Sequence, residues 1–172
     1  MNHVMTRSAV LTTIGFLSAV ASSQGPPLNP SIIGTWQLVA AISREIPSGA
    51  QTDVYGSNPH GYLMYSADGR MMALIVRGDR KKPAESVATP AEAEALFRSM
   101  LSYTGTYIVN GDRVIHHVDA SWNELWTGTD QVRIARFQGD RLTISTEPSV
   151  DPFTGKYSTR QLVWTRLSGA AK

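Results

Sequence analysis

The sequence predicts an all-β protein, an eight-stranded antiparallel up-and-down barrel with one short helix. Three observations support this prediction. Apolar and polar residues alternate through most of the chain after residue 33, as in half-buried strands. Turn sequences that contain glycine recur between these stretches and indicate hairpins. A single stretch has helical periodicity instead. Eight short strands of this kind suit a closed barrel that can hold one small ligand.

The composition limits the class of protein. The 172 residues suit one domain, and the net charge of +2 is too small to indicate nucleic acid or an anionic membrane as a partner. The chain has no cysteine, which excludes disulfides, thiolate metal ligands and a cysteine nucleophile. We expect a monomer or a weak dimer.

The first residues predict export. Residues 1–21 combine a charged start with a short apolar run that ends in Ala19-Val20-Ala21, a cleavage pattern typical of signal peptides. Residues 22–32 are rich in Ser, Gly and Pro and are predicted to be a linker, so the barrel domain would span residues 33–168. The apolar run is short for a membrane span. We expect a secreted or periplasmic protein with no stable span after cleavage; a buried N-terminal helix is the alternative.

The strands follow in order. The first is expected at Gly34–Glu45, with Trp36, Leu38, Ala40 and Ile42 on one face. Three hairpins come next, and each has a turn sequence at its centre that favours positive φ. They cover residues 61–78 around Asp68-Gly69, 103–121 around Asn110-Gly111 and 131–146 around Gly139-Asp140, and a last strand covers 158–167.

One segment, residues 88–103, is predicted to be helical. Thr89 is a good N-cap, Pro90 suits the first helical position, and Glu92 completes a capping box. Four apolar residues are expected to form one face of this helix, packed against the sheet or over an open end of the barrel. They are Leu96, Phe97, Met100 and Leu101.

Several motifs resemble those of a known family. The opening "GTW" and the closing "LVWTR" resemble the first and last strands of lipocalins. The blocks "GYLMYSADGRM", "YTGTYIVNGDRVIHHVDAS", "WTGTDQVR" and "GDRLTIST" are similar to the lipocalin-like domain family of small bacterial and fungal proteins. The resemblance implies a calycin-type barrel in which Arg166 packs on Trp36. It implies no particular activity.

The densest cluster of chemically active residues is "RVIHHVDASWNELWTGTDQVR", residues 113–133. Neighbouring residues on a strand point to opposite faces, so the two histidines cannot share one cavity. Because His116 has the more apolar neighbours, we expect it to point inwards, with His117 and Asp119 as an outer pair. A single bulge would reverse this assignment.

Candidate ligand-binding residues are chosen by position and chemistry. Tyrosines in the predicted hairpins suit an aromatic or polycyclic guest, and Arg133 could bind a carboxylate or phosphate. Plain alternatives stay open: a hydrogen-bonded pocket histidine, tryptophans that plug the barrel end, and a solvated or ion-paired arginine. The candidates are His116, Tyr107, Trp122, Trp126, Arg133, Tyr62 and Tyr103, with Tyr65 as a further lumen tyrosine.

We expect no metal site and no cofactor. A metal needs three or four converging ligands, and only His60, His116 and Glu124 could be imagined together, without a spacing that demands it. The chain has no Gly-x-Ser-x-Gly, no phosphate-binding Gly-rich loop and no His-Glu-x-x-His.

Three functions remain open. The first is an exported barrel that binds a small, partly apolar ligand. The second is an isomerase or cyclase that acts on such a ligand with a His or Tyr as acid or base. The third is a protein-interaction module with a filled core. The catalytic residues of the second alternative cannot be assigned.

Overall fold

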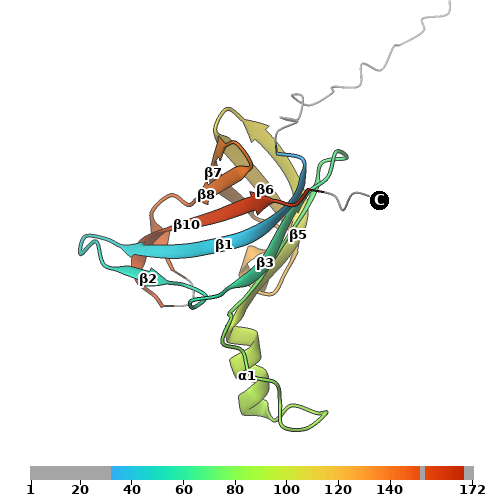
Figure 1. Ribbon diagram of the computed structural model, residues 1–172, viewed down its shortest axis with the longest axis vertical. Coiled ribbons are helices and arrows are strands. Elements are labelled where there is room, and N and C mark those ends of the chain that lie inside the picture. Colours follow the sequence, from blue (N-terminus) through green and yellow to red (C-terminus); the bar gives the residue numbers. More distant parts are fainter. Residues whose placement is uncertain (1–31, 152–153, 169–172) are drawn as a thin grey trace, which may run out of the picture.

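In a computed structural model, the structure describes residues 32–151 and 154–168 (Figure 1). The predicted signal peptide and most of the predicted linker therefore lie outside the described residues. The elements are β1 (Gly34–Glu45), β2 (Gln51–Asp53), β3 (His60–Tyr65), β4 (Arg70–Val76), α1 (Pro90–Arg98), β5 (Met100–Asn110), β6 (Arg113–Ser121), the 3-10 helix η1 (Glu124–Trp126), β7 (Asp130–Gln138), β8 (Arg141–Ser145), β9 (Ser149–Val150) and β10 (Tyr157–Arg166).

The sheet closes on itself. The eight long strands are neighbours in the order β1, β3, β4, β5, β6, β7, β8 and β10, and β10 pairs back with β1. All the pairs are antiparallel, and β2 and β9 are short additions beside β1 and β10. The prediction of an eight-stranded up-and-down barrel with one helix is confirmed. Closure removes exposed strand edges from this part of the fold.

The inner faces of the strands form the core. In β3 and β4, exposed and buried residues alternate strictly, as the sequence predicts. In β1 the expected face of Trp36, Leu38, Ala40 and Ile42 is wrong in its second half. A bulge between Leu38 and Ala40 shifts the register, and Ala41 is buried instead.

One end of the barrel is closed around Trp36. The Arg166 guanidinium lies 4.1 Å from the centre of the Trp36 ring, which confirms the predicted pair. The Trp36 Nε1 donates to the Ile32 carbonyl (2.9 Å), and the Arg166 side chain donates to the Ile33 carbonyl (2.7 Å). Gly34 has a φ of +139°, and a Cβ there would lie 2.7 Å from the guanidinium. Ile32 is fully buried although the sequence places it in the linker.

The helix begins as predicted. Thr89 caps it, Pro90 occupies its first turn, and Glu92 completes the capping box. It is shorter than predicted, because Ser99 is the C-cap and donates to the Leu96 carbonyl. The chain then changes to strand periodicity, so that Met100 and Leu101 begin β5.

The predicted apolar helix face is also wrong. No residue of α1 is buried, and Phe97 is 53% exposed. Leu101 is buried because it points into the barrel from β5, together with Tyr103. Met100 and Leu101 fit both a helical and a strand pattern of apolar residues, and in the structure they follow the strand pattern of β5. The helix projects away from the barrel, beyond the ends of β4 and β5 (Figure 1).

Candidate ligand-binding site

The barrel is hollow. A cavity of about 550 Å³ lies inside it and reaches the segments that follow β8. Much of its wall is apolar and comes from the inner faces of β3, β4, β5, β8 and β10. These residues are Leu63, Ala73, Ile75, Leu101, Ile144, Leu162 and Trp164. A concave apolar wall with a few polar groups is the usual form of a small-molecule site.

The histidine pair divides as predicted between the two faces of β6. His116 is 1% exposed and lines the cavity, between the fully buried Val114 and Val118. His117 points outwards, but its expected partner is wrong. It pairs with Asp130 on β7, because the strand register places these two residues opposite each other. Asp119 pairs with Arg70 instead.

Two tyrosines hold the His116 ring. The Tyr65 hydroxyl on β3 lies 2.8 Å from Nε2, and the Tyr103 hydroxyl on β5 lies 2.9 Å from Nδ1. All three side chains are at least nine-tenths buried. Both ring nitrogens are therefore engaged, which fixes the ring in its plane.

Burial determines the charge state of this group. Desolvation, followed by the positive charge of Arg133, holds the pKa of His116 well below its usual value. Burial also raises the pKa of Tyr65 well above its usual value and raises the pKa of Tyr103. At neutral pH the group is thus two phenols and one neutral imidazole.

Aromatic rings and one arginine continue the wall beside Tyr103. The Trp126 ring in η1 lies edge-on to Tyr103, with centroids 5.6 Å apart, and Trp122 packs edge-on against Trp126 at 5.0 Å. Arg133 lies on the inner face of β7, 5.8 Å from the centre of the Trp126 ring. Trp126 and Arg133 line the cavity, whereas Trp122 supports Trp126.

Arg133 has only uncharged partners. Its guanidinium donates to the Val132 carbonyl at 3.0 Å and to the Gln131 side chain at 3.4 Å, and it lies within hydrogen-bonding reach of the Tyr103 hydroxyl. Within residues 32–151 and 154–168, no carboxylate forms an ion pair with Arg133.

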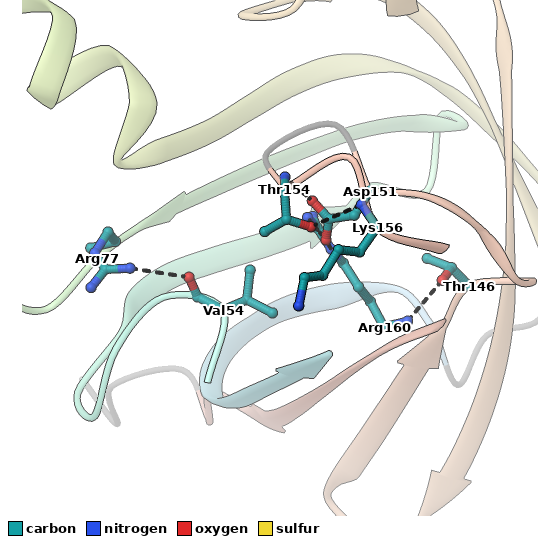
Figure 2. Close-up of polar contacts among 7 residues, drawn as sticks. All are labelled: Val54, Arg77, Thr146, Asp151, Thr154, Lys156 and Arg160. Atoms are coloured by element: carbon teal, nitrogen blue, oxygen red, sulfur yellow. Dashed lines mark hydrogen bonds and ion pairs between the residues drawn. The ribbon is translucent and has the colours of Figure 1, made fainter. Parts of the chain in front are cut away.

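A buried ion pair lies on the other side of the cavity. Figure 2 shows Arg160 of β10 beside Asp151, and Arg160 Nε donates to that carboxylate at 2.9 Å. Asp151 also accepts from the Thr154 backbone, and the Arg160 backbone donates to the Thr146 hydroxyl. Both charged side chains are almost fully buried, so each compensates the other.

This ion pair separates two hollows. A second pocket of about 390 Å³ lies between β1, β2 and the segment around Lys156. Asp151, Arg160, Ser158 and Tyr55 line both this pocket and the inner cavity. Burial raises the pKa of Tyr55 to about 12, so it is a neutral phenol in this wall. Arg77, which donates to the Val54 carbonyl, lines the second pocket but not the inner cavity (Figure 2).

The structure brings together four of the residues that the sequence singles out. They are His116, Tyr103, Trp126 and Arg133. Tyr62 does not belong with them: it is 47% exposed on the outer face of β3, because its parity along the strand is opposite to that of Tyr65. Tyr107 is buried, but its hydroxyl donates to the Ser66 carbonyl at the β3–β4 turn rather than into the cavity.

Sequence reasoning missed several cavity residues. Trp164 shares its face of β10 with Leu162 and Arg166, so strand alternation could have identified it as inward. Tyr55 and Asp151 follow β2 and β9 in irregular segments, where no periodic pattern predicts the direction of a side chain.

The fold and the cavity define a class of protein, the hollow antiparallel β-barrel. A family model described as a lipocalin-like domain matches residues 33–167, and the chain belongs to that family. A search of curated proteins found no match to the chain. None of the helices in the described part of the chain is long and apolar enough to cross a membrane. No three His, Asp or Glu side chains among the same residues lie close enough together to hold a metal.

Proposed function

We propose that the protein binds a small, partly apolar molecule inside its barrel. The observation that supports this most directly is the cavity of about 550 Å³, with an apolar wall and a localised polar group around His116. A family of ligand-holding barrels and an unfilled interior agree with this function. They argue against a filled-core interaction module. The protein would act as a monomer or weak dimer, with the small molecule as its partner.

The test uses a neutral fluorescent probe, N-phenylnaphthylamine, with the barrel domain. We expect its emission to rise on binding, and Ala73→Phe to abolish the rise by filling the cavity. Leu74→Phe is the matched control, because Leu74 is the next residue on β4 and faces outwards. Leu101→Phe offers a second filled cavity if Ala73→Phe does not fold. Equal binding by the filled and control variants would place the probe outside the barrel.

A second candidate function is a cofactor-free isomerase or cyclase. The observation that favours it is the Tyr103 hydroxyl, which lines the cavity and is hydrogen-bonded to a neutral imidazole. Such a group can transfer a proton to or from a bound molecule. The test is native mass spectrometry of protein from its own host, followed by incubation of any co-purified molecule in deuterated water. Turnover predicts deuterium incorporation that falls roughly 100-fold in Tyr103→Phe.

Export belongs to the same proposal. It is supported by the charged start, the apolar run and Ala19-Val20-Ala21. N-terminal sequencing of the secreted or periplasmic protein should begin at or near Ser22. Recovery of exported protein that still begins at Met1 would contradict the cleavage.

A further inference from the structure

We infer that the cavity selects an organic anion: a flat apolar body that carries a carboxylate or a comparable anionic oxygen. This inference rests on the proposed function, because it names the class of molecule bound at the same site. It follows from three parts of the cavity wall, each of which offers a hydrogen-bond donor or a positive charge that the described residues do not use.

The first part is the row Tyr65–His116–Tyr103. Two phenols and a neutral imidazole hold three polar hydrogens in total, and the two hydrogen bonds of the row use two of them. The third hydrogen must point out of one end of the row. It belongs either to Tyr65 or to Tyr103.

The two ends differ in their surroundings. Tyr65 is 2% exposed, does not line the cavity, and has His116 as its only hydrogen-bond partner among the described residues. An outward-pointing Tyr65 hydrogen would be a buried donor without an acceptor, which is unfavourable. Tyr103 lines the cavity. The favoured arrangement has Tyr65 donating to Nε2, Nδ1–H donating to Tyr103, and the Tyr103 hydroxyl donating into the cavity.

The second part is Trp164 on β10. Its indole is 2% exposed and lines the cavity, and its Nε1–H has no hydrogen-bond partner among the described residues. Indole nitrogen can only donate. A buried donor of this kind is matched when a bound molecule supplies an acceptor.

The third part is the charge of Arg133. Two of the carboxylates that line the cavity form ion pairs with arginines, Asp151 with Arg160 and Glu147 with Arg113. The third, Asp130, is exposed and is hydrogen-bonded to His117. Arg133 meets only neutral groups. Among the described residues, Arg133 is therefore a positive charge in the inner wall that forms no ion pair, and it lies beside the donor of Tyr103. An anionic oxygen satisfies this combination, whereas an ammonium group at the same place is repelled by the guanidinium.

The flat body follows from the rings and the apolar wall. Trp126 and Tyr103 present ring surfaces at the Arg133 side of the cavity, and other parts of the wall consist of aliphatic side chains and Trp164. A planar ring can pack against these surfaces while its acidic substituent lies against Arg133.

The experiment compares three probes of the same shape with the barrel domain: naphthoate, naphthamide and naphthylmethylammonium. Affinities are measured by calorimetric titration at neutral pH. We expect naphthoate to bind at least about tenfold more tightly than either of the others, as for a charge-assisted hydrogen bond in a buried site. Arg133→Met should remove this preference and leave naphthamide binding within about twofold.

Matched variants separate the contributions. Tyr103→Phe keeps the ring and removes the hydroxyl, and Trp164→Phe replaces the indole with a smaller aromatic ring that has no N–H. Each should weaken naphthoate binding by about three- to tenfold. Arg136→Met is the control, since Arg136 lies on the same strand as Arg133 but is exposed on the outer face. It should leave all three affinities unchanged.

The outcomes distinguish the two proposals. The inference of an anionic ligand is overturned if naphthoate and naphthamide bind equally tightly and Arg133→Met changes neither affinity. The proposal of a ligand-binding barrel would still be supported if N-phenylnaphthylamine binds and Ala73→Phe abolishes this binding. Tighter binding of naphthylmethylammonium than of naphthoate also overturns the inference that the ligand is an anion. Failure of all the probes to enter the barrel overturns both proposals.

Discussion

Two arginine–tryptophan pairs lie in different parts of this barrel and have different surroundings. At the closed end, the Arg166 guanidinium lies 4.1 Å from the Trp36 ring, and both side chains also donate to backbone carbonyls. At the cavity, Arg133 lies 5.8 Å from the ring of Trp126, which is only partly buried. The first pair is surrounded by protein, whereas the second lines the cavity.

The difference indicates that the closed end around Trp36 stabilises the fold, whereas the cavity around Arg133 is suited to binding a small ligand. Around Trp36, the apolar surface and the polar atoms are matched within the chain, which is how a folding core is usually built. In the cavity wall, Arg133 has no ion pair and the Trp164 Nε1–H has no acceptor among the described residues. Local mismatches of this kind are typical of functional sites.

The largest expected effect separates the two tryptophans. Trp36→Ala should lower the free energy of unfolding by about 3–5 kcal/mol, because it removes a fully buried ring and leaves a cavity. Trp126→Ala should lower it by only about 1–2 kcal/mol, since part of that ring is already exposed. Urea titration followed by circular dichroism measures both. A loss below about 1 kcal/mol for Trp36→Ala would show that the closed end is not the stabilising core.

The two arginines should differ in the same sense. Arg166→Met removes a cation–π contact and a hydrogen bond to the Ile33 carbonyl, and should lower stability by about 1–3 kcal/mol. Arg133→Met removes a partly buried charge that has no counter-ion among the described residues, so stability should change by less than about 1 kcal/mol. Equal losses in the same urea titrations would remove the distinction between the pairs.

Much of this comparison could be predicted from the sequence. The Trp36–Arg166 pair was implied by the resemblance of the first and last strands to those of lipocalins, and the inward direction of His116 followed from strand alternation and its apolar neighbours. Both depend on local patterns that closure of the barrel then preserves. The cross-strand partners of those residues were harder to predict, because the partner of His117 depends on the register of β7, which no single strand encodes.

Irregular segments set the limit of sequence reasoning. The β1 bulge inverted the expected face after Leu38, and the end of α1 at Ser99 moved Leu101 from a helix face to the barrel interior. In both cases, packing of the whole sheet decided between two patterns that the local sequence fits equally. The Asp151–Arg160 pair joins a loop to a strand, and no spacing in the sequence indicates it.

A pH titration tests the polar group at the cavity. An unfolded chain protonates histidine near pH 6.5, whereas folded His116 stays neutral to lower pH because it is buried. Below about pH 6.5 the unfolded state therefore binds more protons, and stability falls as the pH falls. This residue should contribute a loss of about 1.4 kcal/mol between pH 7.5 and pH 5.5.

The control for the titration is His116→Gln, which keeps a donor and an acceptor but does not titrate. Urea unfolding of both proteins at each pH isolates the contribution of His116. The variant should lose about 1.4 kcal/mol less than the wild type over this range. Parallel pH profiles would mean that the pKa of His116 is not lowered in the folded protein. The imidazole between Tyr65 and Tyr103 would then not stay neutral at low pH.

The smallest expected effect concerns α1, which projects beyond the barrel near the cavity end. Phe97 is half exposed and no residue of the helix is buried, so Phe97→Ser should change the free energy of unfolding by less than about 0.5 kcal/mol. Leu101→Ala is the informative partner, because the sequence pattern placed both residues on one helix face. Leu101 is buried in the barrel, and its truncation should lower stability by about 2 kcal/mol or more. If urea titration gave similar losses for the two variants, Phe97 would be packed against the barrel in solution, and α1 would belong to the stabilising core rather than to the open end.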